Sequence, residues 1–273
     1  MFKIRNRLIN LFLLIAFCFL FWLFLNETFP YSKRKSFNAD MPVSEQGERY
    51  DPSLLRLNTL NKLAAYCDSL YAANHSNSSY AVVVSGVISE KFYHGYSYYG
   101  KGHNVFAKMF EPFLFGGVSA IVIPDDIVKY PNAACSQQSI VGMELLKKKG
   151  IPVRKISMFD NQLKAGHFAF EAFYDGAWHF FDPNREPDKQ VLNTYNMPSA
   201  EFLANHPDVV AAAYRRYDAG TFQRLLKSQV PGKPNVFPAK NAFLYHQATK
   251  IISYTLWFII AIILFIRIRK SLW

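Results

Sequence analysis

The sequence predicts an α+β domain between two membrane-spanning helices. Three observations lead to this fold class: an apolar run near each end of the chain, a helical pattern that begins at Cys135, and a hairpin pattern from Gly166 to Asp182. We expect a helical N-terminal half, a helix starting at Cys135 that packs on an antiparallel sheet, and peripheral C-terminal helices.

The apolar run from Leu8 to Leu25 contains Asn10 as its only strongly polar residue and follows three basic residues. Its 18 residues are long enough to span a bilayer. A cleaved signal peptide also begins with basic residues, but residues 25–30 contain no small-x-small cleavage site. The pattern favours an uncleaved anchor, in which Cys18 is an apolar residue in lipid without chemistry.

The second apolar run, Ile251 to Ile266, lies between Lys250 and a basic cluster at 267–270. Its all-round hydrophobicity favours a second span over the alternative, a buried C-terminal core helix. The basic cluster predicts a cytoplasmic C-terminus, and two spans then place the N-terminus in the cytoplasm as well. We therefore expect a two-pass protein of the cell (inner) membrane whose middle part is periplasmic or extracellular.

The formal net charge of +11 arises mainly beside these two runs. Nine of the 31 basic residues flank them, which leaves 22 basic against 19 acidic residues between positions 36 and 266. The high charge is thus a membrane-topology signal, and it gives no reason to expect nucleic acid as a partner.

Composition divides the chain into five segments. Residues 1–28 form an N-terminal tip and span, 29–50 and 225–250 are tethers, 51–224 form the globular domain with its core at 105–190, and 251–273 form the second span and a tail. Besides its central elements, the domain is expected to contain helices at 51–73, 105–114, 199–205 and 208–217, a buried strand at 80–88, and a loop at 124–134.

The helix that begins at Cys135 carries apolar residues at helical spacing, and it ends in three lysines before Gly150 and Pro152. Cys135 lies at its N-terminal end, where unpaired N–H groups and the helix dipole favour a thiolate and lower the pKa of a thiol. The alternative is a buried structural cysteine, which is the commoner fate of a lone cysteine.

A hairpin follows, with Asp175 and Gly176 between two aromatic-rich runs. An Asp-Gly pair in this setting is typical of a two-residue turn. The turn places Phe173 opposite Trp178, and it makes His167 and Asp182 diagonal neighbours on one face. A slip of one residue would put them on opposite faces, so the pairing is a sharp prediction.

Cys135, His167 and Asp182 are the residue types of a thiol nucleophile, its base and the group that orients the base. An imidazole takes the proton of the thiol, and a carboxylate on the other ring nitrogen stabilises the imidazolium. The spacing leaves open whether the helix brings Cys135 to His167. His94 and His103 lack a ligand pattern around them, so we expect no metal, and we expect no cofactor.

Further landmarks surround these residues: a Gly-Ile-Pro-x-Arg segment at 150–154, a His-x-x-x-Glu strand at His167 and Glu171, and Gly-x-Trp then Asp-Pro at 176–183. With this pattern, the stretch 132–184 resembles the core of the transglutaminase-like superfamily of papain-type folds. The resemblance implies Cys135 as nucleophile, His167 as base and Asp182 as the third member. The family commonly has a glycine two positions before the cysteine, where this chain has Ala133, so the nucleophile turn, the oxyanion donors and the substrate stay open.

The resemblance implies a bacterial type of thiol enzyme that acts on amide bonds through a Cys135 thioester, either a cysteine protease-like hydrolase or an acyltransferase. Its partners would be membrane lipid and a peptide, protein or other amide-containing substrate at the envelope. The alternative is an inactive member that serves as a binding or assembly module. A disulfide between Cys67 and Cys135 would make Cys135 structural. Glu171 is interpreted as a supporting or structural residue.

Overall fold

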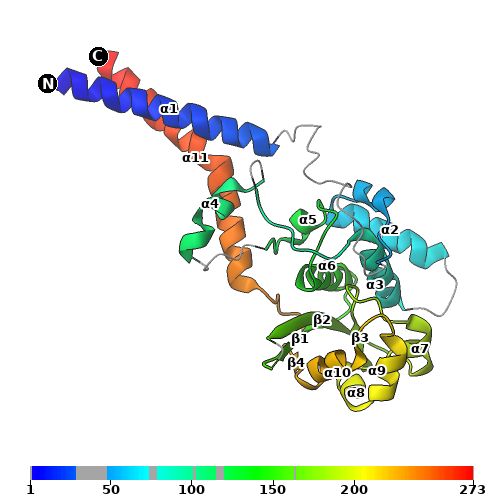
Figure 1. Cartoon of the computed structure of the whole chain (residues 1–273). Helices are drawn as coiled ribbons and strands as arrows, with labels where there is room; N and C mark the ends of the chain where they lie inside the picture. The colour runs from blue at the N-terminus through cyan, green and yellow to red at the C-terminus, as the bar shows by residue number, and fades with distance from the viewer. Residues whose placement is uncertain are drawn as a thin grey trace. The chain divides into compact units, whose positions relative to one another are not determined.

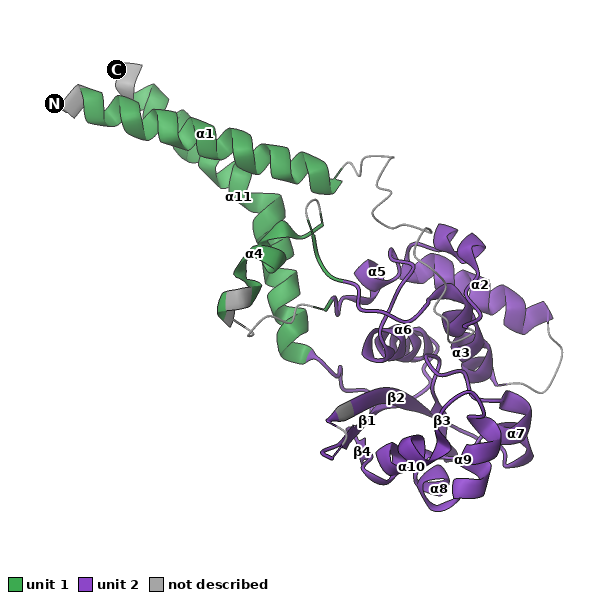
Figure 2. Ribbon diagram, in the orientation of Figure 1, with its two compact units in different colours: residues 1–36, 98–120, 240–273 green, residues 37–97, 121–239 purple. Residues whose placement is uncertain are grey.

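The computed structural model describes residues 2–28, 48–73, 79–100, 103–114, 120–162 and 164–272. The chain divides into two compact units, coloured separately in Figure 2. Unit 1 contains residues 1–36, 98–120 and 240–273, and unit 2 contains residues 37–97 and 121–239. The tether expected at 29–50 lies outside the described residues except for 48–50.

Unit 1 is built on two long apolar helices, α1 (Phe2–Thr28) and α11 (Lys240–Leu272), which run side by side in Figure 1. The rings of Phe21 and Phe24 both lie 5.1 Å from the ring of Trp257, centroid to centroid. Near the chain ends, Arg267 Nε donates to Asn10 Oδ1 at 2.9 Å. The stretches 4–28 and 240–270 are each long and apolar enough to cross a membrane.

The second long helix begins at Lys240, so residues 240–250 are helical and do not form the tether expected at 225–250. Helix α4 (Val105–Leu114) packs on this extension, and the Tyr245 hydroxyl donates to Ala107 O at 2.7 Å. The helix expected at 105–114 is therefore present, but residues 98–120 group with the long helices and not with the rest of the 51–224 segment.

Unit 2 combines helices with a four-stranded antiparallel sheet of order β3-β2-β1-β4. Neighbouring residues of β2 point to opposite faces of this sheet: Phe170 lies against Gly142 of α6, while Glu171 accepts a hydrogen bond from Ala200 of α8. Figure 1 accordingly shows α6 on one side of the sheet and α8 to α10 on the other. The bounds are η1 Pro52–Arg56, α2 Leu60–Ala73, α3 Tyr80–Lys91, α5 Pro124–Ile127, α6 Cys135–Lys148, β1 Val153–Asp160, β2 Ala165–Tyr174, β3 Ala177–Phe181, α7 Lys189–Thr194, α8 Ala200–Asn205, α9 Pro207–Ala213, α10 Ala219–Lys227 and β4 Val230–Pro231.

The prediction of a strand at 80–88 is wrong, because this stretch forms helix α3. Ser79 caps the helix, and its Oγ accepts a hydrogen bond from the N–H of Val82 at 3.4 Å. Helix α3 packs against α2 and α6, and its buried residues occur all around the helix. A helix buried on all sides has no polar face, so its sequence lacks the helical period that would identify it.

The predicted hairpin register is confirmed. Strands β2 and β3 pair with Phe173 opposite Trp178 and Glu171 opposite Phe180. Asp175 and Gly176 have φ angles of 48° and 79°, both in the left-handed region that a two-residue turn of this type requires.

The C-terminal part of unit 2 contains elements that the sequence analysis did not identify. Strand β1 lies between β2 and β4, and α10 occupies residues 219–227, where the predicted tether was expected to begin at 225. The helix expected at 199–205 is present as α8, capped by Ser199. The helix expected at 208–217 is α9, which ends at Ala213.

Candidate active site

Cys135 is the first residue of α6, as the sequence predicts. The residue before it, Ala134, has no side chain that could cap the helix, and the first α-helical bond runs from the N–H of Gln138 to Ala134 O. Within the described residues, the N–H of Cys135 has no hydrogen-bond acceptor. The thiol therefore lies beside an unpaired donor and the positive end of the helix dipole.

Gln137 fixes the turn that presents Cys135. Its Nε2 donates to Ser97 O at 3.1 Å and to Ile121 O at 2.8 Å, and its Oε1 accepts from the N–H of Ala134 at 3.2 Å. The side chain is almost fully buried, so these bonds form out of contact with water. They join the N-terminus of α6 to the chain segments on both sides of residues 98–120.

His167 and Asp182 meet across the hairpin as the diagonal register predicts. Nε2 of His167 lies 2.8 Å from Oδ2 of Asp182, and the two side chains are 3% and 0% exposed. The second carboxylate oxygen of Asp182 accepts the N–H of Arg185 at 3.2 Å. Both oxygens of Asp182 are thus engaged, which fixes the orientation of the imidazole.

The thiol of Cys135 hydrogen bonds to the His167 side chain, so the structure brings all three predicted residues together. Because Nε2 of the imidazole faces Asp182, Nδ1 is the nitrogen that faces the thiol. The backbone of β2 supports the contact, since the N–H of Phe168 bonds to the thiol and Phe168 O accepts from Ser139 Oγ of α6 at 3.3 Å.

The electrostatics of this group favour an ion pair. Burial alone would lower the pKa of His167, but the charge and hydrogen bond of Asp182, with a smaller effect of Cys135, raise it from 6.5 to about 9. Burial alone would raise the pKa of Cys135, but its hydrogen bond to His167 and the charge of the imidazolium lower it below the ordinary value. Both shifts favour a thiolate beside an imidazolium over a neutral thiol beside a neutral imidazole.

Phe222 covers the imidazole, and the sequence analysis did not identify it. Its ring lies 5.8 Å from the His167 ring in an edge-on arrangement, and it is 1% exposed. Phe222 is on α10, whose apolar residues Phe222, Leu225 and Leu226 recur at helical spacing after the capping residue Asp218. That spacing, with the Asp cap, is the signal in the sequence that could have located it.

Glu171 has a structural role on the same strand. Its Oε2 accepts from Arg154 Nε at 2.6 Å, and its Oε1 accepts from the N–H of Ala200 at 2.8 Å. The Arg154 guanidinium also lies 4.3 Å from the centre of the Trp178 ring. Arg154, Glu171 and Trp178, all part of the sequence pattern, therefore form one cluster that joins the sheet to α8.

The remaining cysteines and histidines lie elsewhere in the described part of the chain. Cys67 and Cys135 are both free, so no disulfide makes Cys135 structural. His94 faces the amide of Asn184 at 3.0 Å. Among the described residues, no group of three or more His, Cys, Asp or Glu side chains has the arrangement of a metal site.

Part of this chain matches a crystal structure of a protein from Cytophaga hutchinsonii described as a candidate cysteine protease. The two share 16% sequence identity at a TM-score of 0.33, over 53% of this chain and 45% of the other. The matched part thus spans less than half of that protein. No protein-family model and no curated protein matches the chain.

Proposed function

We propose that this chain is a membrane-anchored thiol enzyme of the transglutaminase-like superfamily that acts on amide bonds. One observation carries the proposal: a half-buried thiol at a helix N-terminus bonds to an imidazole whose other nitrogen bonds to a buried carboxylate. The residue pattern at 150–183 supports the same assignment. Cys135 is the nucleophile, His167 the general acid and base, and Asp182 the residue that positions His167.

In the acylation step, the Cys135 thiolate attacks the carbonyl carbon of the amide. The protonated His167 gives its proton to the leaving nitrogen, the C–N bond breaks, and a thioester with Cys135 forms. The unpaired N–H of Cys135 donates to the oxyanion that develops on the carbonyl oxygen.

In the second step, neutral His167 takes a proton from the acceptor as it attacks the carbonyl carbon of the thioester, the C–S bond breaks, and the Cys135 thiolate is released beside the imidazolium. Water as acceptor gives hydrolysis, and an amine gives acyl transfer. Asp182 stabilises the imidazolium in both steps, because its carboxylate stays bonded to Nε2 while Nδ1 exchanges the proton.

The two long apolar helices support a place in the membrane. The basic residues at 267–270 favour a cytoplasmic C-terminus, and two spans then put unit 2 outside the cytoplasm. The substrate would be an amide-containing molecule of the envelope or the cell surface.

The test is the rate of Cys135 alkylation against pH, measured on the full chain in lipid nanodiscs. Cys18 is exposed on α1, so the Cys18→Ser background removes the competing thiol. Cys67 is fully buried, and burial raises its pKa to about 12, so it reports any unfolding of unit 2 in the same sample. A Cys135→Ser variant identifies the signal of the reactive thiol.

We expect a midpoint well below the ordinary thiol value of about 8.5, and an upward shift in His167→Ala. A midpoint near the ordinary value that does not respond to His167→Ala, with Cys67 still protected, would refute the enzyme and favour the inactive binding module.

A further inference from the structure

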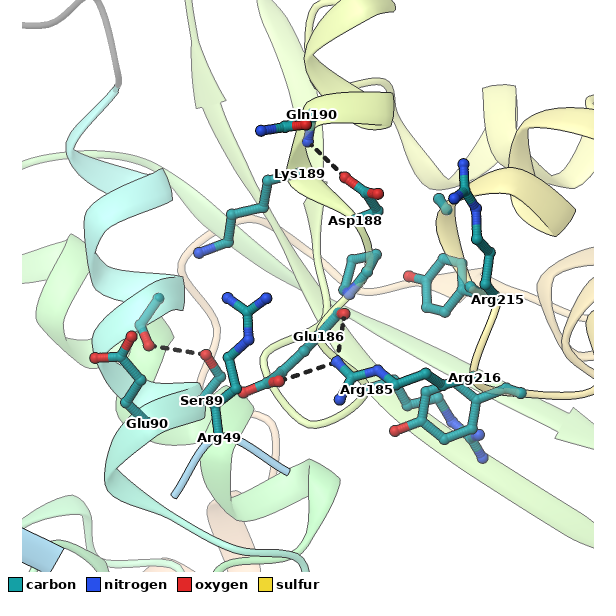
Figure 3. Close-up of a pocket in the computed structure, with 15 residues that line it drawn as sticks. Arg49, Ser89, Glu90, Arg185, Glu186, Asp188, Lys189, Gln190, Arg215 and Arg216 are labelled. Atoms are coloured by element: carbon teal, nitrogen blue, oxygen red, sulfur yellow. Dashed lines mark hydrogen bonds and ion pairs between the residues drawn. The ribbon is translucent and has the colours of Figure 1, made fainter. Parts of the chain in front are cut away.

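A pocket of about 590 Å³ opens in unit 2 beside the segment that follows Asp182 (Figure 3). Its walls come from α3, from residues 185–190 and from residues 213–217, and Cys135 does not line it. Five basic and three acidic side chains face it. The pocket therefore has an excess of positive charge, although unit 2 as a whole is not strongly basic.

Three of these cations form no ion pair or hydrogen bond within the described residues. In the described part of the chain, the side chains of Arg49, Arg185 and Lys189 form no salt bridge and no hydrogen bond. Two of the acids have partners: Glu186 Oε2 accepts from Arg216 at 3.1 Å, although Glu186 Oε1 is buried without a partner in the described residues, and Asp188 caps α7. With five basic and three acidic side chains, the pocket keeps an excess of positive charge.

The amino group of Lys189 lies close to the backbone of α3. A Cβ atom at Gly86 would lie 2.8 Å from Lys189 Nζ, so the glycine leaves room for the amino group. Figure 3 shows the Lys189 and Arg49 side chains pointing toward one another. Burial lowers the pKa of Lys189, and the charge of Arg49 lowers it further, while Glu186 and Glu90 act in the opposite sense.

The wall of the pocket also contains buried donors without acceptors. Tyr214 is 1% exposed, and its hydroxyl has no hydrogen-bond partner among the described residues. The Nε of Arg185 is likewise buried and unpaired, while its guanidinium lies 4.5 Å from the centre of the Tyr217 ring. Buried donors without partners cost free energy, which an acceptor in the pocket would recover.

We propose that this pocket is an anion-binding site for a ligand that carries phosphate or carboxylate groups. Arg49, Arg185 and Lys189 provide the charge, and the Tyr214 hydroxyl and the guanidinium of Arg185 provide hydrogen bonds to oxygen atoms. The volume admits more than a single oxyanion, so the ligand is a molecule that presents such a group and not only the free ion.

The pocket is connected to the candidate active site through one short segment. The N–H of Arg185 bonds to Asp182 Oδ1, and the N–H of Glu186 bonds to Asp182 O at 3.1 Å. The residues that position Asp182 therefore also line the pocket. Under the proposed function, the anionic group belongs either to the substrate or to a separate effector.

The test is a calorimetric titration of the full chain in nanodiscs of uncharged lipid, with inorganic phosphate and with citrate as probes. We expect saturable binding of at least one probe, weakened about tenfold or more in Lys189→Gln and in Arg49→Gln, because each loses a charged donor. Arg215→Gln is the matched control, since Arg215 lines the pocket but donates to Ala212 O. Protection of Cys67 from alkylation verifies that each variant is folded.

A Cys135→Ser variant separates this proposal from the proposed enzyme, because it removes the thiol and should bind the probes as the wild type does. Two results would overturn the anion site: no saturable binding of either probe to the folded wild type, or binding that neither Lys189→Gln nor Arg49→Gln weakens. If the alkylation midpoint of Cys135 moves when the probe binds, the ligand acts through Asp182 as an effector. If phosphate or citrate instead slows alkylation of Cys135 without a change of midpoint, the ligand occupies the substrate path.

Discussion

Glu171 lies on the same strand as His167 and belongs to the same sequence pattern, so its role could be structural or catalytic. A substitution at this position distinguishes the two roles. We predict that Glu171→Ala destabilises unit 2 and leaves the acid–base behaviour of Cys135 unchanged. The carboxylate is 1% exposed and holds both Arg154 and the N–H of Ala200. Truncation leaves a partly buried guanidinium and an unpaired N–H, for a cost of about 3–5 kcal/mol.

Glu171→Gln gives a graded comparison. The amide oxygen of Gln can still accept the N–H of Ala200, but the salt bridge to Arg154 is lost. We therefore expect a smaller loss, about 1.5–3 kcal/mol, as for one hydrogen bond to a charged group. Glu201→Gln on α8 is the matched control, since Glu201 is exposed, and its effect should stay within about 0.5 kcal/mol.

The assay uses two cysteines of one unit in the Cys18→Ser background. The alkylation rate of Cys67, relative to that of the denatured chain, measures how often unit 2 opens, and a loss of about 3 kcal/mol raises it by about two powers of ten. The alkylation midpoint of Cys135 measures the state of the thiol. One result would contradict a structural role for Glu171. In that result, Glu171→Gln shifts the alkylation midpoint of Cys135 as His167→Ala does, while the alkylation rate of Cys67 stays as low as in Glu201→Gln.

Three further predictions concern the packing and charge of the same site. Asp182→Asn removes the charge that raises the pKa of His167, and this effect outweighs the smaller direct effect by which Asp182 raises the pKa of Cys135, so the alkylation midpoint of Cys135 should rise; an unchanged midpoint would contradict the assigned role of Asp182. Gly142→Ala places a Cβ 2.8 Å from Phe170 Cε1, so the urea midpoint of Cys67 protection should fall, by about 1–3 kcal/mol in stability; a gain from the better helix propensity of alanine would show that α6 can shift. The folded-state pKa of His167 is raised to about 9, so its stabilising contribution is fully present below pH 6.5 and is lost as the pH rises through about 9. The stability difference between wild type and His167→Gln, measured by Cys67 protection, should therefore shrink between pH 6.5 and about 9.

The central part of the site was predictable because local signals fix it. Asp175 and Gly176 determine the turn, the turn determines the register, and the register determines that His167 and Asp182 share a face. The helix that starts at Cys135 was also predictable from nearby residues, since its lysines and Gly150 mark its end. The contact between Cys135 and His167 was not predictable, because it depends on how α6 lies on β2.

The errors occur where burial hides the pattern or where the surroundings set the role of a residue. Residues 80–88 are apolar on all faces because α3 packs between other elements, so the helical period is absent. Phe222 became part of the site through the packing of α10 on the sheet, and Arg185 and Lys189 became parts of a pocket through the path of the chain after Asp182. These are long-range arrangements that no short stretch of sequence encodes.

The hydrogen bond between the N–H of Ile121 and Ser97 O, at 3.0 Å, has a consequence for protein engineering. The chain leaves unit 2 at Ser97 and returns at Ile121, so residues 98–120 are an insertion whose two ends already touch. Closing such a short gap with glycines costs little entropy. We expect that a chain of residues 37–97 joined through a few glycines to 121–239 folds as a water-soluble protein that retains Cys135, His167 and Asp182, since Gln137 holds both ends of the junction in place.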